Sequence, residues 1–208
     1  MIYLDNSSTT KPDEKAILAM MNAVENYGNP SSPHGMGTTS SSLLKEARHT
    51  IALAMKCDSS ELYFTSGGSE SNNTAIIGLA HKNSRHSKRI VTTDSEHPSV
   101  SEPLAYLEKN GFEIIRLSTK GGKLDFGQLR DALSQKTCLV TIMQVNNETG
   151  ALYPIEKIRE VEAISGKAIS TLEHVAIYPA SHYVVSPEKM EEALEKINNE
   201  MELQVAEF

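Results

Sequence analysis

No stretch of the 208-residue sequence is apolar over the roughly 18 residues that a membrane-spanning helix needs. The first residues, Ile2-Tyr3-Leu4, predict a short strand and lack the charged and then apolar pattern of an export leader. We therefore expect a cytoplasmic protein that neither crosses nor binds a membrane.

Cysteine is also scarce, since the chain holds only Cys57 and Cys138. Cys57 follows a predicted helix and Cys138 lies in an apolar strand, and both positions are typical of buried, reduced thiols. Packing in the core is the favoured role for each, with catalysis as the alternative. No metal site is expected.

The composition that remains is that of a globular protein, with 39% hydrophobic residues and a net charge of -7 spread along the chain. An acidic balance of this kind argues against a nucleic-acid surface as the main function. One basic patch runs from His81 to Arg89, but no aromatic side chains interleave it. A solvated connection is its favoured interpretation, and nucleic-acid contact is the alternative.

Hydrophobic periodicity predicts an alternation of helices and strands. An opening helix has Pro12 in its first turn, and Pro154 opens another amphipathic helix. The alternation predicts an α/β fold with a mostly parallel sheet and helices on its faces. The predicted strands are 62–64, 90–93, 112–117 and 137–143, and the predicted helices between them are 43–55, 69–81, 98–110 and 125–133.

A glycine turn at Gly67-Gly68 joins the predicted strand at Leu62–Phe64 to the helix that follows. Helix N-termini leave N–H groups unpaired and carry a partial positive charge, so a phosphate can settle there. Ser69 is expected to cap the helix and to add a hydroxyl donor. The alternative is that the glycines form an ordinary turn.

Two further polar clusters follow predicted strands, one holding His97 and the other holding Asn147. Open α/β sheets place ligand contacts at the carboxyl ends of their strands. The clusters at Gly67, His97 and Asn147 therefore indicate one assembled site. The alternatives are that His97 caps a helix or binds backbone and that Asn147 holds its own turn.

Five motifs occur in the order and spacing of one enzyme family: YLDNSSTT from Tyr3, GNPSSPHG from Gly28, FTSGGSESNN from Phe64, SEH from Ser95 and MQVNNETG from Met143. Residues 1–168 resemble the N-terminal segment and part of the large domain of a cysteine desulfurase of the NifS/IscS type, within the class V aminotransferases.

The resemblance implies a partial pyridoxal-phosphate transferase fold of type I. It also implies that Gly68 and Ser69 hold the cofactor phosphate, that His97 stacks on the pyridine ring and moves protons as the catalytic residue, and that Asn147 contacts the ring hydroxyl. Such enzymes form homodimers, take sulfur from L-cysteine to leave alanine, and pass it to an acceptor protein for iron-sulfur cluster assembly.

The resemblance stops short of the catalytic amine. His174-Val175-Ala176 has alanine where the family has the aspartate that pairs with the ring nitrogen, and no Ser-x-His-Lys follows. The family's cysteine loop is also missing. We therefore expect pyridoxal 5′-phosphate to bind noncovalently at best, and it is uncertain whether this chain is an enzyme.

Residues 169–208 form a second segment, whose sequence predicts a short strand, a turn, and a helix capped by Ser186. From His174 on, this segment resembles a fragment of the UvrB subunit of nucleotide excision repair, without that family's nucleotide-binding motifs, so no contact with nucleic acid is expected. The alternatives to an enzyme are a noncatalytic binding or dimerisation module, and a fusion product without a selected function.

Overall fold

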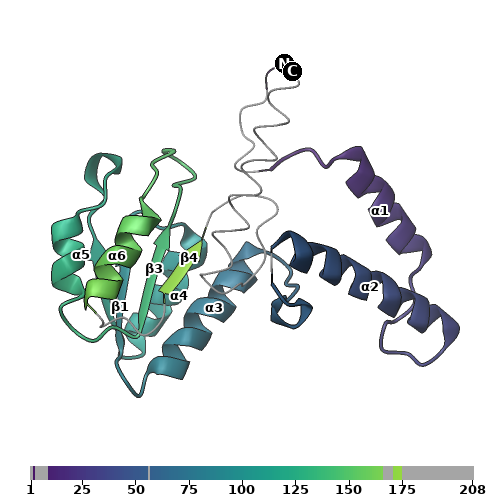
Figure 1. Ribbon diagram of the computed structural model, residues 1–208, viewed down its shortest axis with the longest axis horizontal. Helices are drawn as coiled ribbons and strands as arrows, with labels where there is room; N and C mark the ends of the chain where they lie inside the picture. Colours follow the sequence, from purple (N-terminus) through teal and green to yellow (C-terminus); the bar gives the residue numbers. More distant parts are fainter. Residues whose placement is uncertain (1, 3–8, 56, 166–170, 175–208) are drawn as a thin grey trace. The chain divides into compact units, whose positions relative to one another are not determined.

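The computed structural model describes residues 2, 9–55, 57–165 and 171–174. The described residues fall into two compact units, one reaching to Tyr63 and the other beginning at Phe64 (Figure 1). The strand expected at Ile2–Leu4 and the helix expected after Ser186 lie outside the described residues.

The N-terminal unit holds helices α1 (Glu14–Glu25) and α2 (Gly35–Ala54) and the 3-10 helix η1 (Ser59–Glu61). Asp13 caps α1 by accepting the Lys15 N–H at 2.8 Å, so Pro12 precedes the helix and does not lie in its first turn. The helix expected from Leu43 begins earlier, at Gly35, because the His34 ring caps it there.

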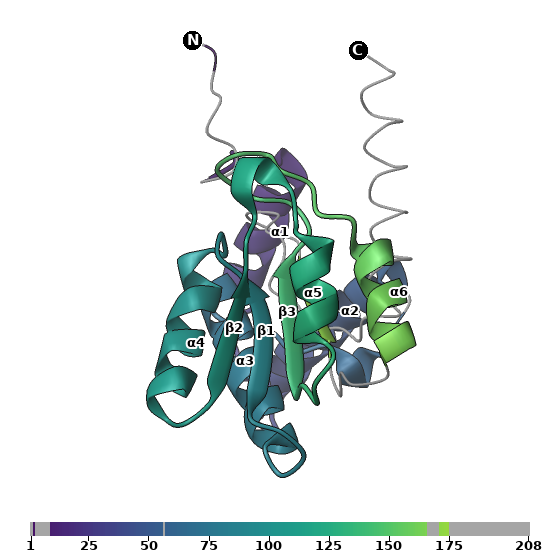
Figure 2. The ribbon, with the colours of Figure 1, turned by 90° about the vertical axis from the view of Figure 1, so that its left-hand side faces the viewer.

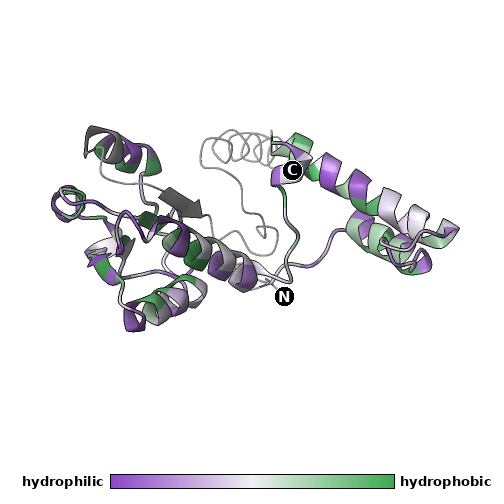
Figure 3. Cartoon of the chain, turned by 90° about the horizontal axis from the view of Figure 1, so that it is seen from below, coloured by the Kyte–Doolittle hydropathy of each residue, from purple (hydrophilic) through white to green (hydrophobic). Residues whose placement is uncertain are grey.

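The loop between α1 and α2 is tightly packed. A side chain at position 37 would collide with the Ser32 carbonyl, which explains why glycine stands there. The Ser40 hydroxyl donates to the Asn26 carbonyl at 2.6 Å and ties α2 to the end of α1. Hydrophobic side chains such as Leu18 and Met20 are nevertheless exposed in this unit, and Figure 3 colours the chain by the hydropathy of each residue.

The second unit is built on a sheet of four parallel strands in the order β2-β1-β3-β4. Its register pairs Ile90 with Ile114 on one side and with Leu139 on the other. The predicted α/β class and parallel sheet are therefore confirmed, and helices flank the strands (Figure 2). The strands are β1 (Arg89–Thr93), β2 (Glu113–Leu117), β3 (Leu139–Met143) and β4 (Thr171–His174).

The helices of this unit form two pairs. α3 (Gly68–Asn83) packs on α4 (Pro98–Lys109), and α5 (Phe126–Ala132) packs on α6 (Ile155–Ser165). Between β2 and α5 the chain makes a 3-10 turn, η2 (Lys120–Gly122), in which Gly121 and Gly122 have φ of 69° and 73°. These positive angles explain the glycine pair, since other residues rarely adopt them.

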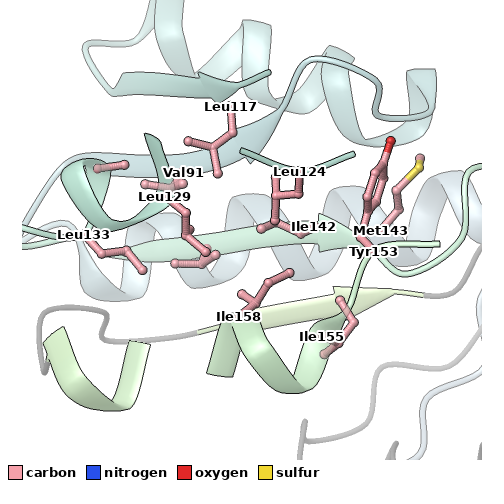
Figure 4. Close-up of a cluster of buried hydrophobic side chains, with 12 residues drawn as sticks. Val91, Leu117, Leu124, Leu129, Leu133, Ile142, Met143, Tyr153, Ile155 and Ile158 are labelled. Atoms are coloured by element: carbon pink, nitrogen blue, oxygen red, sulfur yellow. The ribbon is translucent and has the colours of Figure 1, made fainter. Parts of the chain in front are cut away.

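The buried core under α5 and α6 is aliphatic and closely packed. Leu129 of α5 and Ile158 of α6 meet Val91 and Ile142 of the sheet, and Tyr153 lies at one end of the cluster (Figure 4). Burial of such side chains contributes on the order of 1.5 to 3 kcal/mol each, so this cluster is a main source of stability for the unit.

Two sequence expectations need correction here. Residues 62–64 are not a strand in the described structure, although Leu62 has an extended backbone with φ of −97°, because a strand requires a hydrogen-bonded neighbour. Cys57 is half-buried rather than buried. Cys138 is buried as expected, and burial raises the pKa of its thiol to about 11, which makes it a poor nucleophile.

The core account predicts the effect of Leu129→Ala, which empties a fully buried position. We expect the free energy of unfolding to fall by about 2 to 5 kcal/mol, measured by urea denaturation. Leu152→Ala is the matched control, since Leu152 is 66% exposed, and its effect should stay within about 0.5 kcal/mol. Equal effects of the two substitutions would contradict the assignment of the core.

Candidate functional site

The glycine turn opens α3 without a side-chain cap. Gly67 is the N-cap residue, with an extended backbone (φ 168°, ψ 173°), and the helix starts at Gly68. The expected capping role of Ser69 is therefore wrong, because Ser69 lies inside the first turn. The first helical hydrogen bond runs from the Ser71 N–H to the Gly67 carbonyl at 3.1 Å. The helix geometry leaves the preceding N–H groups, including those of Gly68 and Ser69, without intrahelical acceptors.

Side chains within the turn hold its shape. The Thr65 and Ser71 hydroxyls lie 2.7 Å apart, and the Thr65 hydroxyl also donates to the Gly67 carbonyl at 3.2 Å. The Glu70 carboxylate accepts both the backbone N–H and the hydroxyl of Ser66 at 2.6 Å. These two bonds, the hydroxyl first, lower the pKa of Glu70 below its ordinary value of 4.5.

His97 is the N-cap residue of α4. Its Nδ1 atom accepts the Ser99 N–H at 3.1 Å and lies 2.8 Å from the Ser99 hydroxyl oxygen. The structure therefore contains the helix cap that the sequence gave as the alternative role of His97. The cap engages one ring nitrogen and fixes the orientation of the half-buried imidazole.

Asn146, rather than Asn147, holds the loop after β3. The Asn146 side-chain oxygen accepts the Glu148 N–H at 3.0 Å, and the N–H and hydroxyl of Thr149 at 2.9 and 3.0 Å. Asn146 is buried, whereas Asn147 is half-buried and its side chain makes no hydrogen bond to the residues that the structure describes.

Hydrogen bonds gather the three polar clusters at the carboxyl edge of the sheet. The Asn72 amide of α3 donates to the Ser99 hydroxyl at 2.9 Å, two residues from His97. The Asn146 amide donates to the Ser95 carbonyl at 3.0 Å, which joins the loop after β3 to the loop after β1. The structure therefore brings together the segments that carry Gly68, Ser69, His97 and Asn147.

The Glu96 carboxylate also connects the carboxyl ends of β1 and β3. Glu96 accepts the Met143 N–H at 3.1 Å, at the last residue of β3, and the Thr93 hydroxyl at 2.7 Å, at the last residue of β1. Strand β4 ends beside Met143, which pairs with His174. Ala176, where the family's aspartate is expected, lies outside the described residues.

Sequence reasoning missed the residues that join the clusters. Four residues make these contacts, and all lie in or just after the recognised motifs: Asn72, Glu96, Ser99 and Asn146. Each of them forms a hydrogen bond to a residue far away in the sequence. A polar residue at a strand end is a weak signal of such contacts. Choosing between Asn146 and Asn147 requires the structure, because the two share one side-chain chemistry.

Comparison with known proteins identifies the class of this fold and site. Residues 2–175 match the family model described as aminotransferase class-V. A NifS homologue of Lactobacillus delbrueckii subsp. bulgaricus is 44% identical over 165 residues, which are 78% of this chain and 43% of the relative. A cysteine desulfurase IscS of Methanosarcina thermophila is 41% identical over 162 residues, 77% of this chain and 40% of the relative.

Solved structures agree with these relatives. A NifS-like protein superposes with a TM-score of 0.75 at 32% identity, over 84% of this chain and 48% of its own. A structure titled SspA in complex with cysteine gives a TM-score of 0.73 at 32% identity, over 82% of this chain and 49% of its own. The chain belongs to the class V aminotransferase family. It spans about two fifths of the length of the curated cysteine desulfurases it matches.

The donors at this edge suit a phosphorylated aromatic ring, the cofactor class on which the family depends. Helix N–H groups at Gly68 and Ser69 suit a phosphate, the imidazole offers a flat face to a ring, and the uncommitted Asn147 amide suits a ring oxygen. Within the described part of the chain no three His, Cys, Asp or Glu side chains gather as metal ligands do. None of the helices described there is long and apolar enough to cross a membrane.

Replacing each of the two asparagines distinguishes the residue that holds the loop after β3 from its neighbour. Asn146→Ala should lower the free energy of unfolding by about 1 to 3 kcal/mol, because it leaves buried loop groups unpaired. Asn147→Ala should change it by less than about 0.5 kcal/mol. Chemical denaturation of both variants measures the difference. A larger loss for Asn147→Ala would contradict the assignment.

The Glu70 contact predicts a pH-dependent contribution to stability. Because the folded-state pKa is lowered, the contribution is present above 4.5 and is lost as pH falls through the folded-state pKa. Glu70→Gln should therefore lower the Tm at neutral pH, and the difference from the original protein should vanish in acid. A thermal-melt series over pH tests this, and a difference that persists in acid would show that charge is not the cause.

Proposed function

We propose that this chain binds pyridoxal 5′-phosphate noncovalently as the cofactor-binding part of a cysteine desulfurase. Gly68 and Ser69 would hold the phosphate through helix N–H groups and a hydroxyl. The His97 imidazole would lie against the pyridine ring, and the Asn147 amide would donate to its hydroxyl oxygen. The observation that supports this proposal is the pair of hydrogen bonds, Asn72 to Ser99 and Asn146 to Ser95, that draws these segments together.

The cofactor, when bound, supplies an electron sink for bonds at the amino-acid α-carbon. This chain's own residues would bind and orient it, since the turn at Thr65 and Ser71 is hydrogen-bonded into shape before any ligand arrives. The sequence holds neither the family's lysine motif nor its aspartate, and Cys138 is buried with a raised pKa. We therefore propose that sulfur transfer from L-cysteine to an acceptor protein, as in iron-sulfur cluster assembly, is not completed by this chain alone.

A noncatalytic binding or dimerisation module is the second candidate function. None of the side chains of α1 is buried, and Leu18, Met20, Met21 and Val24 are 66%, 63%, 59% and 66% exposed. Apolar side chains gathered on one helix favour association with another surface. A homo-oligomer in the cytoplasm is the form that we propose for this candidate.

The segment after the family match is the part for which a fusion is proposed. The family model ends at residue 175, and the UvrB-like sequence begins at His174. We propose the join near residues 167–172 and the segment boundary at 168, and the family match runs a few residues beyond both, to residue 175. No action on DNA is assigned to this segment, because its sequence holds none of the nucleotide-binding motifs.

Cofactor binding can be tested with an analogue that has no aldehyde. 4-Deoxypyridoxine 5′-phosphate cannot bond a lysine, so it should bind as tightly as pyridoxal 5′-phosphate in a calorimetric titration, and pyridoxal without the phosphate should bind at least about tenfold more weakly. A much tighter affinity for the aldehyde, with an adduct trapped by borohydride, would show that another lysine replaces the missing one.

Variants of α3 locate the phosphate. Gly68→Asp adds a negative charge at the helix start and should weaken binding by about tenfold or more. Gly78→Asp is the matched control, because it adds the same charge to the middle of the same helix, at a position with open space around it. If both variants bind as tightly as the original protein does, the proposal that the phosphate binds at this turn is wrong.

A further inference from the structure

Two donors of one residue converge on Nδ1 of His97. The Ser99 N–H lies 3.1 Å from this nitrogen, and the Ser99 hydroxyl oxygen lies 2.8 Å from it. A backbone N–H can only donate, so Nδ1 must present its lone pair and carry no proton. In a neutral imidazole the proton then lies on Nε2.

Asn72 determines which way the Ser99 hydroxyl points. Its side-chain nitrogen, which has only donors, lies 2.9 Å from the Ser99 hydroxyl oxygen. The oxygen therefore accepts from Asn72 and directs its own single proton elsewhere. The nitrogen of His97, 2.8 Å away, is the acceptor within reach. A chain of donors thus runs from α3 through Ser99 to the imidazole.

This arrangement exceeds what a helix cap requires. A cap needs one acceptor for an N–H of the first turn, and the Ser99 N–H already supplies that contact. The hydroxyl adds a second donor to the same nitrogen, and Asn72 adds a third residue from a different helix. These additional bonds favour the tautomer with an unprotonated Nδ1 more strongly than the helix cap alone would.

We propose that Ser99 and Asn72 are positioning residues that hold the His97 imidazole in the Nε2–H tautomer. The consequence for a ligand rests on the function proposed above. With Nδ1 acting as the acceptor, a neutral His97 carries its proton at Nε2, and this nitrogen would be the one that donates to an acceptor on a bound ligand.

The tautomer can be measured directly on the full chain. Protonated and unprotonated ring nitrogens resonate far apart in long-range ¹H–¹⁵N correlation spectra, and His97→Gln identifies the signals of His97 among the 7 histidines. At alkaline pH, where imidazole is neutral, we expect Nδ1 to be unprotonated and Nε2 to carry the proton. A ring protonated at Nδ1 would overturn the proposal.

Substitutions then test the two positioning residues. Ser99→Ala keeps the backbone N–H but removes the hydroxyl, and should raise the Nδ1–H population about fivefold, the effect of one ordinary hydrogen bond. Asn72→Asp should raise it further, because a carboxylate accepts the Ser99 proton and leaves the hydroxyl oxygen as an acceptor facing Nδ1.

Asn73→Asp is the matched control. It makes the same change one residue along α3, where the Asn73 amide donates to the Ser69 carbonyl at 2.7 Å instead of to Ser99. This variant should leave the tautomer unchanged. An equal response of both variants would show that charge near the ring, rather than the hydrogen-bonded chain, sets the tautomer, and would overturn the proposal.

The ligand step is measured separately, so that its failure is recognised. On titration with 4-deoxypyridoxine 5′-phosphate, the Nε2 signal of His97 should shift with the same affinity as the bulk binding isotherm. Binding without a shift at His97 would overturn the donor role at the ligand while leaving the cofactor site standing. Absence of any binding would overturn the proposed function and with it the donor role, whereas the tautomer result in the free chain would still stand.

Discussion

The loop between β1 and α4 connects every part of the candidate site. Its Ser95 carbonyl accepts from the loop after β3, and its Glu96 carboxylate receives donors at the ends of β1 and β3, while the Ser99 hydroxyl, in the first turn of α4, accepts from α3. A parallel sheet places all these ends at one edge, so short polar contacts suffice to join them. The site depends on this loop keeping its shape.

Much of the fold follows from local sequence. The buried runs Ile90–Thr93 and Leu139–Met143 are strands because β-branched and aliphatic residues favour a sheet covered on both faces, and Asp125 and Pro154 mark helix starts where they were expected. The errors have physical reasons. Residues 62–64 look like a strand, but extended backbone needs a neighbour that local sequence does not reveal.

The candidate site was predictable in its location but less so in the contacts of each side chain. Of the three clusters, those of His97 and Asn147 follow strands, whereas the glycine turn follows residues 62–64, which are not a strand. The structure then gave the details: α3 has Gly67 rather than Ser69 as its N-cap residue, and Asn146 rather than Asn147 holds the loop after β3 through hydrogen bonds to Glu148 and Thr149. The roles of Gly68, Ser69, His97 and Asn147 toward a cofactor remain predictions.

The chain thus contains an α/β unit of the class V aminotransferase family. It spans about two fifths of the length of its curated relatives. Noncovalent cofactor binding and full catalysis depend on different residues. Under the proposed function, binding would use the turn, the imidazole and the amide, whereas catalysis would also need a lysine and a carboxylate, and the sequence holds neither of the family's motifs for them.

The most direct test of the central claim is an amide-resolved NMR titration with 4-deoxypyridoxine 5′-phosphate. The backbone signals of Gly68 and Ser69, the ring signals of His97 and the side-chain NH₂ signals of Asn147 should all shift with one common dissociation constant. Shifts confined to the basic stretch from His81 to Arg89, or different constants for the four residues, would show that they do not form one site.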